Sequence, residues 1–252
     1  MKYNPIADLL LKHVIQAEQH CEYYAIGDVH GCVKEYNALT DMCEHDARLQ
    51  GKYARIFQLG DMIDRGPAFA DMIIEDRADF QVMGNHEYNF ILEHYGYKQY
   101  SSLARNKNHE LMAQFPKAKQ QLIVDLLLDR ATFYVITIDD QTFVLSHAPI
   151  KDIEKGIGFI YRDAVGSVPN YCMRSTPVDL EQLRAHHSNT TFVHGHQKWN
   201  YHDLETQVEE QRAFDVASYN IDAGCVYGGD LVALRLRDSG VLKVKSNISV
   251  DK

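Results

Sequence analysis

Five short apolar runs in this chain each stop at an Asp, an Asn or a His. A short apolar run bounded by turn residues is typical of a buried strand. Open α/β sheets place their ligands at the carboxyl ends of their strands, so we expect the polar side chains after these runs to converge on one point. The runs are Tyr24 to Gly27 before Asp28 and His30, Ile56 to Gly60 before Asp61, Phe80 to Gly84 before Asn85 and His86, Thr142 to Ser146 before His147, and Thr191 to Gly195 before His196.

Helical periodicity alternates with the first strands. After a strand at about Tyr23 to Gly27, apolar residues recur at helical spacing from Val33 to Cys43 and predict a helix packed on that strand. A second strand, Ile56 to Leu59, precedes a helix expected to open near Pro67, where the missing N–H of proline costs nothing. The other expected elements are helices at Pro5 to Gln19 and Glu87 to Tyr95, a helical insertion from Gly96 to Ala131 with one element starting at Pro116, a hairpin of Thr132 to Ile138 and Thr142 to Ser146, a helix start at Thr176-Pro177, and antiparallel strands at Asp230 to Arg237 and Val241 to Val250.

Length and composition are those of one globular domain. The 252 residues contain no Pro-, Gly- or Ser-rich linker, so a single domain over residues 1–252 with a mixed-sheet α/β sandwich is expected. The apolar cluster Leu9 to Leu11 is short and flanked by charges, which favours a cytoplasmic protein without a membrane partner. The five cysteines are odd in number and form no C-x-x-C pair, so reduced thiols are expected.

The net charge of −9 argues against long nucleic acid as a partner, because a surface that follows a phosphate backbone needs clustered Lys and Arg. Carboxylates gathered around divalent cations would be neutralised there. The composition leaves the oligomeric state open.

Asp28 and His30 are the first candidate metal ligands. They lie two residues apart just past a strand, so both side chains are expected on the same side of the backbone. A carboxylate and an imidazole aimed together suit Mn, Fe or Zn. In isolation, the same pair also fits a capped turn.

Two glycine-flanked segments make the metal interpretation much more specific. In Gly60-Asp61-Met-Ile-Asp64-Arg65-Gly66, Asp61 can ligate or bridge, Asp64 can orient a neighbour, and Arg65 can reach two phosphate oxygens with its planar fork. In Gly84-Asn85-His86-Glu87, a neutral amide ligand stands beside a histidine suited to proton transfer.

Together with Gly27-Asp-Val-His-Gly31, these segments resemble the three signature blocks of the phosphoprotein-phosphatase family of calcineurin-like metallophosphoesterases. The resemblance continues through Ser146-His147-Ala148, Gly195-His196 and Asp222-Ala-Gly224, and is closest to small bacterial and phage members. It implies a four-layer α/β/β/α sandwich with two mixed sheets. It also implies two divalent metal ions, Mn in the first place and Fe or Zn as alternatives.

The resemblance also implies which residues hold the metals. Asp28, His30 and Asp61 match the ligands of one ion; Asp61 as a bridge, Asn85, His147 and His196 match those of the other. The family block aligns on the histidine after the glycine, so His196 is chosen over His194, which is expected to lie in the strand as a packing residue. Asp222 is expected to support the site without ligating a metal.

The implied reaction is phosphomonoester hydrolysis by direct attack of a metal-bridging hydroxide. Arg65 would neutralise charge on the phosphoryl oxygens, and His86, held by Asp64, would protonate the departing oxygen. For the second phosphate-binding arginine that the family implies, Arg162 is the candidate, although an ion pair with Asp163 fits it equally well, and Arg174 is the fallback.

Three functions remain open at the level of sequence. Asp64 and Glu87 resemble the protein-phosphatase members and favour a protein serine/threonine phosphatase, with a phosphorylated protein as substrate. The segment from Asp222 to Leu234 instead resembles symmetrical bis(5′-nucleosyl)-tetraphosphate hydrolases, whose substrate is a small nucleotide phosphoester. A non-catalytic, metal-stabilised binding module is the third; it should have lost a ligand or the proton donor, and none is missing here.

Overall fold

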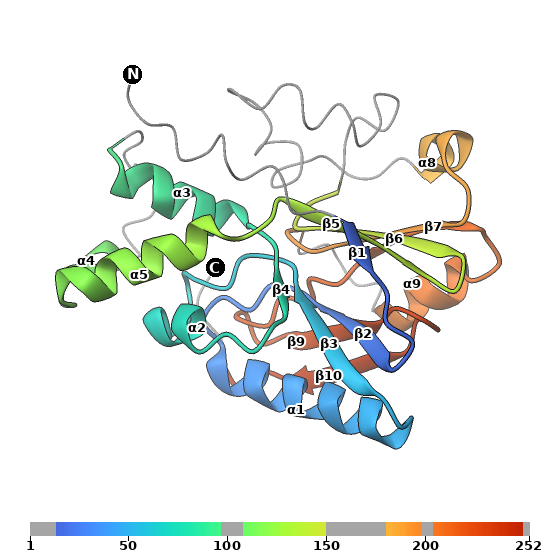
Figure 1. Cartoon of the computed structure of the whole chain (residues 1–252), viewed down its shortest axis with the longest axis horizontal. Coiled ribbons are helices and arrows are strands. Elements are labelled where there is room, and N and C mark those ends of the chain that lie inside the picture. Colours follow the sequence, from blue (N-terminus) through green and yellow to red (C-terminus); the bar gives the residue numbers. More distant parts are fainter. Residues whose placement is uncertain (1–13, 97–107, 150–179, 198–203, 249–252) are drawn as a thin grey trace.

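The computed structural model of the chain describes residues 14–96, 108–149, 180–197 and 204–248, which form two five-stranded mixed sheets (Figure 1). The first sheet has the order β1 (Val14–Gln16), β5 (Phe133–Ile138), β6 (Gln141–Ser146), β7 (Thr190–His194), β8 (Val216–Asn220). The second has the order β10 (Val241–Lys245), β9 (Asp230–Arg235), β2 (Cys21–Ile26), β3 (Tyr53–Gln58), β4 (Phe80–Gln81).

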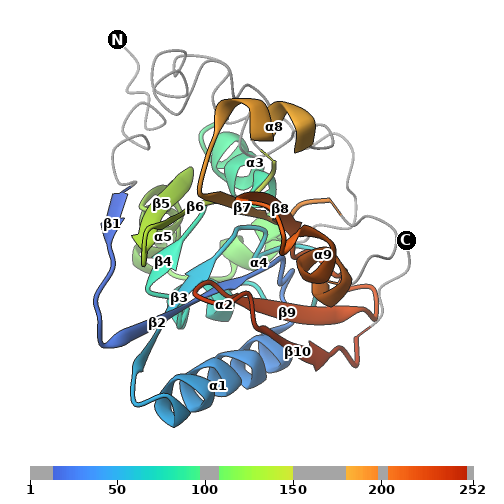
Figure 2. The same ribbon diagram turned by 90° about the vertical axis from the view of Figure 1, so that its right-hand side faces the viewer.

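Helices cover the outer faces of both sheets. In Figure 2, α1 lies below the second sheet, and α8 lies above the first. The helices are α1 (Val33–Leu49), α2 (Ala70–Ile74), α3 (Asn85–His94), α4 (Asn108–Ala113), α5 (Lys117–Leu128), α8 (Leu180–His186) and α9 (Leu204–Gln211). None of them is long and apolar enough to cross a membrane. The layers therefore follow the expected α/β/β/α order.

Strand β2 shows how the sequence serves two cores at once. Tyr23 and Ala25 lie in the apolar cluster between the sheets, where the ring of Tyr23 meets that of Phe57. Tyr24 and Ile26 lie in the other cluster, under α1. Successive side chains of a strand point to opposite faces, and both faces are covered here, so all six residues of β2 are buried.

The prediction of one helix is wrong in the part of it that the structure describes. The helix expected at Pro5 to Gln19 gives way at Val14–Gln16 to the short strand β1, which pairs in parallel with Val135–Thr137 of β5. Residues 1–13 lie outside the described ranges. An edge strand of this length is held by backbone hydrogen bonds to a neighbour far along the chain, which local apolar spacing cannot reveal.

The other expected elements are present where the structure describes them, with shifted bounds; residues 97–107 of the helical insertion and 249–250 of the tail lie outside the described ranges. The hairpin of β5 and β6 turns at Asp139 and Asp140, whose φ values of 47° and 68° match the turn that suits twisted strands. Strands β9 and β10 pair antiparallel, as expected for the tail. Helix α2 begins at Ala70 instead of near Pro67, because the preceding residues form a loop at the site described below. The expected helix start at Thr176-Pro177 lies outside the described residues.

A buried ion pair links the segment after α5 to the segment after α2. The Arg130 guanidinium, 3% exposed, lies 3.2 Å from the carboxylate of Asp76. The same carboxylate accepts hydrogen bonds from the Tyr36 hydroxyl on α1 at 2.6 Å and from the Ala78 N–H at 3.0 Å. One carboxylate therefore pairs with a buried cation and accepts from two further donors.

We expect Asp76→Ala to lower the free energy of unfolding by about 3–5 kcal/mol, because it leaves the Arg130 charge buried without its partner. Urea denaturation of the metal-free protein measures the change. Asp71→Ala, an exposed position on α2, is the control and should change little. A loss below about 1 kcal/mol for Asp76→Ala would show that the pair is not structural.

Candidate metal centre

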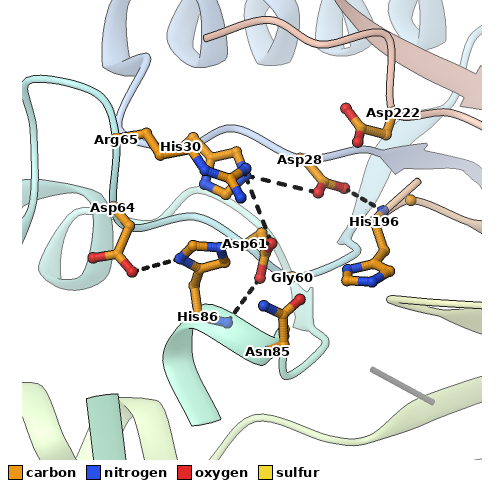
Figure 3. Close-up of polar contacts among 12 residues, drawn as sticks. Asp28, His30, Gly60, Asp61, Asp64, Arg65, Asn85, His86, His196 and Asp222 are labelled. Carbon is orange, nitrogen blue, oxygen red and sulfur yellow. Dashed lines mark hydrogen bonds and ion pairs between the residues drawn. The ribbon is translucent and has the colours of Figure 1, made fainter. Parts of the chain in front are cut away.

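The strand ends of both sheets deliver the candidate ligands to one place. Asp28 and His30 follow β2, Asp61 follows β3, Asn85 and His86 open α3 after β4, His147 follows β6, and His196 follows β7. Figure 3 shows the labelled side chains of Asp28, His30, Asp61, Asn85, His86 and His196 around a common centre. The convergence predicted from the apolar runs is present.

One group of ligand atoms surrounds the Oδ2 atom of Asp61. The Nε2 atoms of His30 and His86 lie 3.6 and 3.7 Å from it. The Asp28 Oδ2 atom lies 3.9 Å from His30 Nε2. His30 Nδ1 donates to the carbonyl of Ile63 at 2.9 Å, which fixes the ring with Nε2, an acceptor, facing the centre.

The other group surrounds the second oxygen of the same carboxylate. His147 Nε2 lies 3.4 Å from Asp61 Oδ1, 3.0 Å from Asn85 Oδ1 and 3.2 Å from His196 Nδ1. His147 Nδ1 donates to the carbonyl of Leu59 at 2.8 Å, so Nε2 of the neutral ring is an acceptor. In this neutral form, which is the form that binds a metal, lone pairs of nitrogen and oxygen face one another and favour a bound cation between them. Asp61 belongs to both groups.

The electrostatics also favour cations. Burial lowers the pKa of His147, yet the carboxylates of Asp61 and Asp28 raise it to about 10. Burial raises the pKa of Asp28 well above its usual value, and the nearby Asp222 carboxylate raises it further. The imidazoles of His147 and His86 in turn lower the pKa of Asp61 well below its usual value, although burial alone would raise it. The upward shift of His147 shows that the carboxylates around it create a negative potential. Divalent cations would neutralise it.

Glu87 holds the loop that carries Asp61. Its buried carboxylate accepts hydrogen bonds from the backbone N–H groups of Asp61, Met62, Ile63 and Gly84 at 2.8–3.1 Å. This role of Glu87 was not predicted from the sequence. The available signal was its place three residues after the helix N-cap Gly84, where an acid reaches back to backbone donors.

The ligand loops adopt strained backbone conformations. Positive φ values occur at His30 (46°), Asp61 (52°), Asp64 (72°), Arg65 (70°) and His196 (65°), none of which is glycine. Such conformations persist where the surroundings enforce them, and they cluster at functional sites. Gly84 meets a related constraint, because a Cβ there would overlap the backbone and carboxylate of Asp61.

Three further predicted residues lie beside the ligands. His86 Nδ1 is 2.5 Å from Asp64 Oδ2, which directs Nε2 of the ring towards Asp61. Burial lowers the pKa of His86, but Asp61 and Asp64 raise it more, so the net shift is upward. The Arg65 guanidinium contacts His30 Nε2 and lies 5.6 Å from the centre of the Tyr227 ring.

Of the remaining candidate site residues, two lie in the described part of the structure and two lie outside it. His194 lies at the end of β7, where burial lowers its pKa to about 4 and its ring contacts the carbonyl of Gly195. Asp222 is partly exposed, and its carboxylate accepts the N–H of Gly224 at 3.0 Å. Both placements agree with supporting roles. Arg162 and its fallback Arg174 lie outside the described residues.

A family model described as calcineurin-like phosphoesterase matches residues 23–233. The chain belongs to this family. Metallophosphoesterases use divalent metal ions, and the two groups of facing acceptors around Asp61 fit such ions. The resemblance drawn from the sequence blocks is confirmed at the level of the family.

Curated relatives match nearly the whole chain at low identity. A protein from Anoxybacillus flavithermus (strain DSM 21510 / WK1), named asymmetrical bis(5′-nucleosyl)-tetraphosphatase PrpE, is 28% identical over 247 residues, covering 90% of this chain and 95% of the relative. A protein of the same name from Geobacillus thermodenitrificans (strain NG80-2) is 27% identical over 247 residues, covering 88% and 94%.

Solved structures support the fold. A proposed diadenosine tetraphosphatase superposes with a TM-score of 0.57 at 18% identity, covering 93% of this chain and 98% of the other. A cold-active protein tyrosine phosphatase gives a TM-score of 0.54 at 16% identity, covering 100% and 86%. Neighbours of such different specificity share an architecture, so the likeness does not select a substrate.

We expect Asp61→Asn to abolish the pairing of the metals, because the amide removes the shared negative charge. Protein stripped with chelator and refilled with Mn should hold about two Mn per chain, and the variant at most about one. Elemental analysis after gel filtration gives the count. Asp222→Asn is the matched control and should keep both ions. Equal Mn in Asp61→Asn and wild-type protein would remove Asp61 from the bridging position.

Proposed function

We propose that this chain is a dinuclear-metal phosphoesterase that hydrolyses dinucleoside polyphosphates. The observation that carries the chemistry is the single carboxylate of Asp61 between two groups of facing ligand atoms. The substrate class is supported by relatives that are named for it and match this chain over about nine tenths of both lengths.

We assign the ligands from the two groups. Asp28, His30 and Asp61 would hold one ion; Asp61, Asn85, His147 and His196 would hold the other. The mixture of carboxylate, amide and imidazole suits Mn, with Fe or Zn as alternatives. When bound, the two ions supply an acidified water as nucleophile and neutralise charge on the phosphoryl group.

The protein's own side chains would carry the rest of the reaction. Arg65 stands beside His30 with a planar fork that can donate to two phosphoryl oxygens. His86, held through Nδ1 by Asp64, presents Nε2 to the centre and would donate a proton to the departing oxygen. Arg162 remains the candidate for a second phosphate contact.

A second candidate, the protein serine/threonine phosphatase, is favoured by one specific observation. The departing alkoxide of serine or threonine is a strong base and needs a proton donor, whereas a departing nucleotide phosphate is a much weaker base. The His86–Asp64 pair is built as such a donor, with both side chains buried. The two candidates therefore differ in how strongly they depend on His86.

A substrate panel distinguishes them. Protein refilled with Mn is offered diadenosine tetraphosphate, a phosphoserine peptide, a phosphotyrosine peptide and 4-nitrophenyl phosphate, and kcat/KM is compared. We expect the dinucleotide to give the largest value. Its products identify the bond that breaks, because asymmetrical cleavage gives ATP and AMP, whereas symmetrical cleavage gives ADP alone.

Each outcome selects one function. A preference for the phosphoserine peptide would replace the dinucleotide proposal with the protein phosphatase. Formation of ADP alone would replace asymmetrical by symmetrical cleavage. Inactivity on all four substrates, with two metals bound, would favour a binding module on this fold.

His86→Asn should lower kcat by about 10²–10⁴-fold on phenyl phosphate, whose leaving group is basic, and by less on 4-nitrophenyl phosphate. The comparison of the two fold-losses in kcat decides the role of His86, since a loss of structure would lower kcat equally on both substrates. Metal content should stay at the wild-type level. An equal loss on both substrates would contradict the proton-donor role.

A further inference from the structure

Asp64 is held from both sides. Its Oδ2 atom faces His86, and its Oδ1 atom accepts a hydrogen bond from the side-chain amide of Asn108. Asn108 is 6% exposed and is the first residue of α4. Helix α4 belongs to the segment 96–131, to which neither the sequence nor the proposed mechanism assigns a role.

Helix α4 is anchored so that Asn108 points inward. Met112, one turn further along, is 3% exposed and lies in the apolar cluster that also contains Phe90 of α3 and Val124 of α5. Residues four apart share one face of a helix, so the packing of Met112 turns Asn108 towards the same interior. Figure 1 shows α3, α4 and α5 gathered at one end of the molecule.

The Asn108 amide supplies a hydrogen-bond donor that the buried Asp64 carboxylate requires. Asp64 is 4% exposed, and a buried carboxylate requires donors at its oxygens. Its backbone also has a φ of 72°, a left-handed conformation that is uncommon for residues other than glycine. A donor on Oδ1 fixes the plane of the carboxylate, and that plane determines where Oδ2 meets His86.

We propose that Asn108 is a positioning residue that acts through Asp64 on His86, and that the inserted helix α4 serves to place it. This inference rests on the assignment of His86 as proton donor in the proposed function. Two consecutive hydrogen bonds then join side chains from three separate segments: Asn108 of α4, Asp64 of the loop after β3, and His86 of α3.

A double-mutant cycle tests whether Asn108 acts through Asp64 on His86. Asn108→Leu keeps the approximate volume and removes the amide, and it is combined with His86→Asn. We expect Asn108→Leu alone to lower kcat on phenyl phosphate by about 10–100-fold, with a smaller loss on 4-nitrophenyl phosphate and unchanged Mn content. In the His86→Asn background the same substitution should cost less than about 2-fold, because its target is gone.

The control lies on the same helix. Glu110 is exposed, so Glu110→Gln should leave kcat at the wild-type level in both backgrounds. If Asn108→Leu fails to fold, Asn108→Ser, which is too short to reach Asp64, takes its place in the cycle. Losses of equal size with and without His86 would overturn the proposal and make Asn108 a purely structural residue of α4.

This test separates the inference from the proposed function. The cycle uses aryl phosphates, so it can be read whichever physiological substrate the panel selects. A preference for phosphoserine would overturn the dinucleotide proposal and leave the cycle intact. Additive losses in the cycle would overturn the role of Asn108 and leave the substrate assignment intact.

Discussion

The carboxylate of Asp61 is the constraint on which the rest of the site depends. Its two oxygens face two separate groups of nitrogen and oxygen acceptors, one around His30 and the other around His147. The backbone carbonyls of Ile63 and Leu59 occupy the Nδ1 atoms of these two rings. With both rings neutral, their Nε2 atoms and the oxygen atoms around them are all acceptors, which bound cations would satisfy.

The fold holds these candidate ligands in place. The two sheets point the carboxyl ends of β2, β3, β6 and β7 at one region, so each strand delivers a ligand directly. The Glu87 carboxylate accepts the backbone N–H groups of Asp61, Met62 and Ile63, and these bonds help to hold Asp61 in its left-handed conformation. Local strain at the site is offset by hydrogen bonds that reach it from α3.

Much of this was accessible from the sequence, because strands followed at once by Asp, Asn or His are a local signal. The βα units, the hairpin at Asp139-Asp140 and the convergence of the ligands depend on such signals. The failures are non-local. Strand β1 depends on pairing with β5 more than a hundred residues later, and the bond between Asn108 and Asp64 joins segments 44 residues apart. No periodicity in the sequence encodes either contact.

Anomalous diffraction from crystals of the Mn-refilled protein tests the central claim most directly, because it locates each metal independently of activity. We expect two peaks about 3.5–4 Å apart, one beside each oxygen of Asp61. A single peak, or two peaks that share no contact with Asp61, would contradict it.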